Sequence, residues 1–173
     1  MKKLILGLLF FGLAVQSFAQ VDKDEELPEV VVNFVNYKYI GNVGSEDGDL
    51  AQGVKLLQRE AANFNIKESN LWDLYQDEYE LYNVTFYIPD GKIVAAYDID
   101  GKVVRTIEKY KNVKLPSIVL KSVTKKYPGW SVSNDVYKVT YHHEEGVTKT
   151  YNLILEEGDN KIRVKTDENG KFI

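Results

Sequence analysis

Hydrophobic and polar residues alternate along most of the second half of the chain. Between positions 82 and 88 every second residue is large and apolar, namely Tyr82, Val84, Phe86 and Ile88. This period of two is that of a strand with one buried face. Similar patterns predict further strands over residues 93–97, 103–110, 130–143, 147–156 and 161–166. Turn residues rich in Gly, Asp and Pro separate these segments, so we expect antiparallel hairpins.

The apolar period changes to that of a helix in two places. A stripe at helical spacing predicts a first helix with Asp49 as its N-cap, and it consists of Leu50, Val54, Leu57, Ala61 and Phe64. A second helix is expected to begin at Pro116 and to stop at Pro128-Gly129, with an apolar face of Val119, Leu120, Val123 and Tyr127. Each helix precedes a set of strands. The predicted class is therefore α+β, with helices covering one face of an antiparallel sheet.

Residues 82–104 and 151–173 match without a gap at a spacing of 69 positions, which is 151 − 82. Seven aligned pairs are identical: Tyr82/Tyr151, Asn83/Asn152, Lys92/Lys161, Ile93/Ile162, Asp98/Asp167, Gly101/Gly170 and Lys102/Lys171. The shared register and the matching apolar phase indicate a duplicated unit. We predict tandem repeats over residues 49–113 and 114–173, which together form one structural domain with one curved sheet.

The first 19 residues have the three parts of a secretory signal. Lys2 and Lys3 supply the positive start, residues 4–15 are uncharged and mostly apolar, and Ser17-Phe18-Ala19 places small residues before Gln20. A membrane-spanning helix needs about 20 apolar residues. The run here has 12, so cleavage is favoured over anchoring. We expect a signal peptide over residues 1–19 and an N-terminal arm with a candidate strand over residues 20–48. The protein would then be periplasmic or secreted.

Composition narrows the class of partner. The chain has no cysteine, so a hydrophobic core must hold the fold without disulfides. It has 22 basic and 26 acidic residues, and loss of Lys2 and Lys3 with the signal peptide leaves 20 − 26, a net charge of −6. This balance argues against nucleic acid and against an anionic membrane surface as partners. Part of the charge lies in the arm, at Asp22, Asp24, Glu25, Glu26 and Glu29.

Two polar clusters invite a metal interpretation. If Gly101 takes position 6 of an EF-hand loop, Ala96 and Ile107 fall on ligand positions that they cannot fill, and the loop at Gly170 is too short. Both segments are therefore interpreted as hairpin turns. His142 and His143 are adjacent on a predicted strand, where neighbours point to opposite faces, and they offer too few ligands for zinc. We predict no metal and no cofactor.

The remaining patterns carry no recognisable catalysis. Without cysteine, and without the sequence signatures of a nucleophile elbow, a phosphate loop or a dinucleotide turn, no catalytic residue is predicted and the chain is expected not to be an enzyme. Aromatic residues crowd an acidic stretch at Trp72, Tyr75, Tyr79 and Tyr82. They are interpreted as part of the sheet core, with a recognition surface as the alternative.

Several segments, in their order and spacing, resemble the PepSY-like exported proteins of Bacteroidota, which are similar to the β-lactamase inhibitory protein fold. The resemblance covers about residues 49–173 and is carried by residues 82–87, 91–98 and 100–102, by Thr106, by Leu115-Pro116 and by residues 127–130. It implies tandem helix-plus-hairpin repeats that share one curved sheet and leave a helix-free face open. It also implies binding or inhibition of peptidases and other enzymes, with no catalytic residues.

The strand phase assigns ten residues to the helix-free face, and these are the candidate partner-binding residues: Asn83, Thr85, Tyr87, Lys138, Thr140, His142, Thr150, Asn152, Arg163 and Lys165. The favoured hypothesis is a non-enzymatic exported binding module, such as a protein or peptidase inhibitor, that contacts an unknown protein or peptide of the cell envelope. The alternative is a small-molecule or metal-binding envelope protein with no established catalysis.

Overall fold

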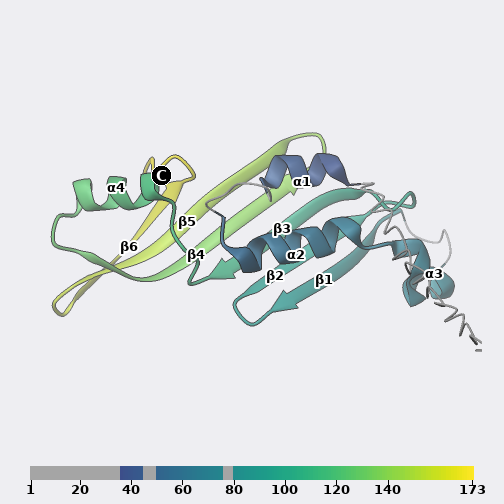
Figure 1. The fold of residues 1–173 in the computed structure, drawn as a ribbon, viewed down its shortest axis with the longest axis horizontal. Helices are drawn as coiled ribbons and strands as arrows, with labels where there is room; N and C mark the ends of the chain where they lie inside the picture. Colours follow the sequence, from purple (N-terminus) through teal and green to yellow (C-terminus); the bar gives the residue numbers. More distant parts are fainter. Residues whose placement is uncertain (1–35, 45–49, 76–79) are drawn as a thin grey trace, which may run out of the picture. The chain divides into compact units, whose positions relative to one another are not determined.

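The computed structural model describes residues 36–44, 50–75 and 80–173 (Figure 1). The helices are α1 (Tyr37–Val43), α2 (Gln52–Asn63), the 3-10 helix η1 (Ile66–Glu68), α3 (Asn70–Tyr75) and α4 (Ser117–Lys126). The strands are β1 (Tyr82–Ile88), β2 (Gly91–Tyr97), β3 (Val103–Lys111), β4 (Ser131–His142), β5 (Gly146–Glu157) and β6 (Asn160–Asp167). The predicted signal peptide, and the predicted arm as far as residue 35, lie outside the described residues.

The six strands form one antiparallel sheet in the order of the chain, β1-β2-β3-β4-β5-β6. The α+β class predicted from the sequence is confirmed. Every predicted strand lies within two residues of an observed one at each end, because period-two alternation is interrupted by turn residues at each hairpin. The register shifts at Ala96/Tyr97 and at Val132/Asn134, where bulges alter the pairing of β2 and β4 with their neighbours.

The two aspartate segments form hairpin turns of the same geometry. Asp98 accepts hydrogen bonds on Oδ1 from the backbone N–H groups of Asp100 (3.0 Å) and Lys102 (2.8 Å). Asp167 accepts the corresponding pair from Asn169 (3.0 Å) and Lys171 (2.8 Å). The glycines of these turns have positive φ, 80° and 76°, which a residue with a side chain rarely adopts. The interpretation as turns is confirmed.

Helix α2 begins later than predicted. Its N-cap position is occupied by Ala51, and the predicted N-cap Asp49 lies outside the described residues. The predicted stripe is otherwise correct, since Val54, Leu57 and Ala61 are buried. Figure 1 shows α2 lying across the hairpin of β1 and β2, and the two elements are in contact.

Two other helices depart from the sequence interpretation. The described part of the arm, residues 36–44, contains helix α1, which was not predicted; the candidate strand is not tested, because the rest of the arm lies outside the described residues. In α4, Val119 and Val123 are buried, but Leu120 is 42% exposed. The apolar stripe of this short helix is therefore narrower than predicted, and Leu120 lies at its edge.

One hydrophobic cluster joins the helices to the sheet. Residues of α1, α2 and α4 share it with alternate residues of all the strands from β1 to β5, including Tyr97, Tyr137 and Leu153. Rings extend the packing from strand to strand, because Tyr137 stacks on Tyr110 with centroids 6.0 Å apart and on Tyr151 at 4.7 Å. The tyrosines Tyr137 and Tyr141 of β4 are thus core residues.

A carboxylate is buried within this core. Glu108, on β3, is 1% exposed and accepts four hydrogen bonds. Tyr39 (2.9 Å) and Thr106 (2.9 Å) donate to Oε1, while Gln58 (2.8 Å) and Tyr110 (2.7 Å) donate to Oε2. Burial raises the pKa of Glu108 above its ordinary value of 4.5, although the four hydrogen bonds act in the opposite direction.

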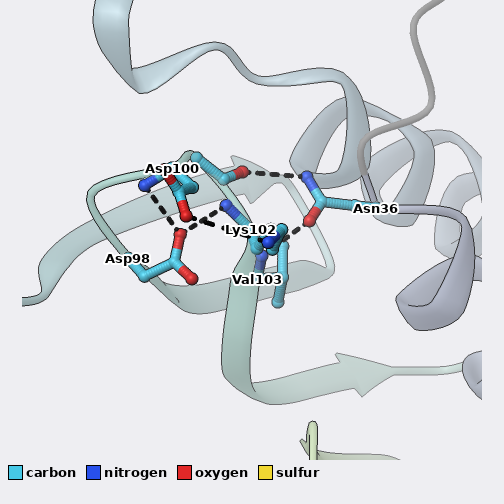
Figure 2. A network of polar contacts seen from close by, with 6 residues as sticks. Asn36, Asp98, Asp100, Lys102 and Val103 are labelled. Carbon is cyan, nitrogen blue, oxygen red and sulfur yellow. Dashed lines mark hydrogen bonds and ion pairs between the residues drawn. The ribbon is translucent and has the colours of Figure 1, made fainter.

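A buried amide fixes the beginning of α1. Figure 2 shows Asn36 beside the turn of Asp98 and Lys102, which joins β2 to β3. Its Nδ2 donates to the carbonyl of Gly101 (3.2 Å), and its Oδ1 accepts from the N–H of Val103 (2.6 Å). Nδ2 also donates to the carbonyl of Ala62 near the end of α2 (3.0 Å). The side chain of Asn36 therefore joins α1 and α2 to the hairpin of β2 and β3.

The raised pKa of Glu108 predicts a pH dependence of stability. The folded protein holds a proton at pH values where the unfolded chain has already lost it, so the stability falls as pH rises from about 4.5 through the folded pKa. The slope in this window is up to about 1.4 kcal/mol per pH unit. Glu108→Gln cannot titrate, and we expect its free energy of unfolding to vary less with pH in urea titrations.

The exposed Glu145, in the turn between β4 and β5, provides the matched control. Glu145→Gln should retain the pH dependence of the unsubstituted protein. Equal slopes for the two variants would contradict the role assigned to Glu108.

Candidate functional site

The residues between the core positions of each strand form the opposite face of the sheet, and it is strongly basic. Eight exposed cationic side chains lie on it, and with the exposed Tyr87 and Ile107 they define what we call the basic face: Lys92, Arg105, Lys109, Lys111, Lys138, Lys161, Arg163 and Lys165. They share a face because directly paired residues of antiparallel strands point to the same side.

Little of this charge is neutralised. Two acidic side chains lie on the same face, so its net charge is 8 − 2 = +6, whereas the whole chain has −4. Glu156 pairs with Lys161 at 2.6 Å, and this hydrogen bond lowers the pKa of Glu156. Asp167 is engaged by its own turn. Among the described residues, the other seven cations form no ion pair.

Three lysines lie directly opposite one another on neighbouring strands. Lys92 on β2 pairs with Lys109 on β3, which pairs with Lys138 on β4. We call these three residues the lysine row. Neighbouring strands are about 4.8 Å apart, and like charges in directly opposed positions destabilise a sheet. The row continues to Tyr87 on β1 and to Thr150 on β5.

A hollow adjoins the lysine row at the β1–β2 hairpin. Its volume is about 250 Å³, and its lining includes Tyr87, Lys92, Lys109 and Lys111. The hairpin is held against β3 because the N–H of Lys111 donates to the carbonyl of Asp90 at 2.7 Å. Tyr87 is 71% exposed here. The lining also includes Asp90, so the hollow combines three lysines and one aspartate with one accessible aromatic ring.

The ten predicted face residues all have the strand phase opposite to the core. Seven are exposed: Asn83, Thr85, Tyr87, Lys138, Thr140, Arg163 and Lys165. His142 and Asn152 are half-buried. Thr150 was expected to be accessible on this face, but it is only 8% exposed. Its short side chain lies between the longer Lys138 and Asp167 on the neighbouring strands, which explains the difference.

The basic residues of β2 and β3 were not among the ten predicted face residues. Lys92, Arg105, Lys109 and Lys111 belong to the same face as the predicted residues. The signal was present, because Arg105, Ile107 and Lys109 alternate with buried residues. The alternation gives each strand's phase, but the pairing in the structure is needed to bring three lysines into one row.

The adjacent histidines lie close together at the end of β4. Strand β4 ends at His142, so strand alternation does not separate His143 from it as predicted, and the ring centroids are 4.9 Å apart. His143 Nε2 lies 3.7 Å from the carboxylate of Glu144. In the ranges that the structure describes, no group of three or more His, Cys, Asp or Glu side chains could hold a metal ion.

The aromatic stretch is partly core and partly helix. Tyr82 is buried, and its ring centroid is 6.0 Å from that of Trp72, on α3. Lys67 places its Nζ 5.7 Å from the Trp72 ring. The core interpretation is therefore correct for Tyr82. The helix α3 was not predicted, the side chain of Tyr75 is not described, and Tyr79 lies outside the described residues.

A larger hollow lies on the core side of the sheet, between the start of α2 and the chain around Pro116. Its volume is about 440 Å³, and Tyr137, Tyr151, Lys149 and Glu168 contribute to its lining. Lys149 and Glu168 are 3.5 Å apart and satisfy each other's charge. The basic face, by contrast, presents charges that other described residues leave unpaired.

No protein-family model matches the chain, and no match was found among the curated proteins or the solved structures compared with it. None of the described helices is long and apolar enough to cross a membrane.

The lysine row predicts a measurable cost in stability. Lys109→Gln removes the central charge of the row, and we expect the free energy of unfolding to rise by about 0.5 kcal/mol at low ionic strength. The gain should shrink in about 0.3 M salt, because mobile ions screen the repulsion. Urea denaturation at both salt concentrations measures it.

Lys111→Gln is the matched control, because Lys111 lies on the same strand and face but opposite Val136. Its effect should be smaller at low salt. A stability that is unchanged or reduced in Lys109→Gln at low ionic strength would show that the opposed lysines do not repel one another.

Proposed function

We propose that this chain is a non-enzymatic exported binding module whose helix-free sheet face, the basic face, binds a protein or peptide of the cell envelope. The observation that carries the proposal is the concentration of exposed cations on one face of the sheet, seven of which form no ion pair with another described residue. Unpaired like charges reduce the stability of a sheet. The loss of stability that these charges cause has a functional reason if the face binds a partner.

We also propose that the module consists of two copies of a helix-and-hairpin unit. The two aspartate turns support this, because their four side-chain hydrogen bonds correspond atom for atom. In both, the glycine lies against a helical segment: Gly101 near Ile66 of η1, and Gly170 near Ser122 of α4. The resemblance to PepSY-like proteins is consistent with this arrangement and with helices gathered on the core side.

The size of the sheet suits a specific interface. Six strands at a spacing of about 4.8 Å are about 24 Å wide, and seven-residue strands are about 24 Å long. This gives a flat area of roughly 600 Å², to which protruding lysine and tyrosine side chains add accessible surface. A typical specific complex buries about 800 Å² on each partner. The face can therefore supply most of a standard interface.

Photo-crosslinking tests the location of the interface. A benzophenone side chain in place of Thr140, an exposed residue of β4 on the basic face, should yield a discrete covalent adduct in cells that export the protein. The same replacement of Thr124, an exposed residue of α4, should not yield this adduct. Charge reversal in Arg163→Glu/Lys165→Glu should reduce the Thr140 adduct.

Two results of the cross-linking experiment would contradict this location of the interface. Equal adducts from positions 124 and 140, or no adduct from position 140 in the exporting compartment, would refute the assignment of the interface to this face.

Export itself is tested by the mass of the exported chain. Signal peptidase requires small residues at the cleavage site, so the exported protein should begin at Gln20 after removal of Ala19 and all that precedes it. Intact-mass spectrometry of the periplasmic and secreted fractions measures this. The variant Ala19→Glu should accumulate as the uncleaved precursor, whereas an unprocessed or cytoplasmic unsubstituted chain would contradict the export proposal.

A further inference from the structure

The chemistry of the basic face identifies a class of partner. Resting on the proposed function, we propose that the lysine row binds an acidic polypeptide segment, with carboxylates of the partner placed on Lys92, Lys109 and Lys138. The three ammonium groups come from adjacent strands and are exposed. A row of carboxylates would neutralise the repulsion that the sheet otherwise retains.

The apolar residues of the face favour a polypeptide. Ile107 is 57% exposed and lies on the same strand and face as Lys109, while Tyr87 is 71% exposed at the end of the row. Exposed aromatic residues surrounded by charge are common anchors in protein interfaces. The hollow beside Tyr87 has room for an anchoring side chain. A segment that mixes acidic and apolar residues matches this distribution.

Nucleic acid fits the face less well. Single-stranded nucleic acid is bound by several aromatic side chains on which successive bases stack, and among the described residues of the basic face Tyr87 is the one exposed aromatic. Long polyanions and anionic membranes would in addition meet the negative charge of the remaining chain. A short acidic segment is affected mainly by the positive charges of the basic face next to it, and less by the negative charge of the rest of the chain.

Binding of a defined peptide tests the inference. The probe is a fluorescent peptide of about ten residues, long enough to cross the sheet, in which Glu alternates with Leu and Ser. Fluorescence anisotropy with the mature chain should show binding that weakens as salt is raised. The triple variant Lys92→Gln/Lys109→Gln/Lys138→Gln should bind at least about tenfold more weakly.

Two controls isolate the row. Lys114→Gln/Lys121→Gln/Lys125→Gln changes the net charge equally at exposed lysines away from the basic face, and it should bind the peptide as the unsubstituted chain does. The same peptide with Gln in place of Glu should not bind. Thermal unfolding followed by circular dichroism should show that the row variant is at least as stable as the unsubstituted chain, so lost binding cannot reflect lost folding.

Several results would overturn the inference. Equal weakening by the two triple variants, or equal binding of the Glu and Gln peptides, would remove the row as an acid-recognition site. Tighter, row-dependent binding of single-stranded DNA of about 20 nucleotides, or of phosphatidylglycerol vesicles, would assign the face to a different class of ligand. Peptide binding that appears only after the five acids of residues 20–35 are replaced by amides would make the chain's own arm the occupant.

The two proposals can fail separately. If the cross-linked adduct at position 140 persists in the row variant while the acidic peptide does not bind, the face is an interface for a partner of other chemistry. If the peptide binds through the row but no adduct forms in cells, the acid-binding chemistry stands and the proposed cellular role does not.

Discussion

The fold depends on a carboxylate that has been taken out of water. An uncompensated buried charge costs several kcal/mol, and the four donors of Glu108 offset part of this cost. Tyr39 comes from α1 and Gln58 from α2, while the other donors flank Glu108 on β3. The two helices are therefore required in one position on the sheet. Tyr110 on β3 stacks on Tyr137 on β4, which extends the packing around Glu108 to the next strand.

The same interaction determines what the other face presents. Residues alternate along β3, so Thr106, Glu108 and Tyr110 are buried while Lys109 is exposed. A slip of one residue would expose Glu108 and bury Lys109, where no set of acceptors awaits it. Because Glu108 has partners on the core side alone, the phase of β3 is fixed. The lysine row is then a consequence of pairing β3 with β2 and β4.

Much of this architecture follows from the sequence alone, and the exceptions have physical reasons. The strands were predictable because alternation and turns such as Asp98-Ile99-Asp100-Gly101 are local signals. Helix α1 was not, because Asn36 at its N-cap position is held by bonds to Ala62, Gly101 and Val103, which are distant in the sequence. Glutamate is usually exposed to solvent, and the burial of Glu108 is understood only from its four hydrogen-bond donors. The bonds of Asn36, and those of Glu108 with Tyr39 and Gln58, join distant parts of the chain, which no local pattern encodes.

The net charge of the chain is less informative about its partners than the distribution of charge over its surface. A net charge of −4 over the whole sequence argues against anionic partners, yet one face of the sheet carries +6. Both statements hold, because the field near a surface is set by the charges within about 10 Å, the screening length in dilute salt. The rest of the chain is acidic in sum and therefore disfavours the approach of an acidic partner away from the basic face. It thereby directs association to the basic face, as expected where complementary charge governs encounter more than final affinity.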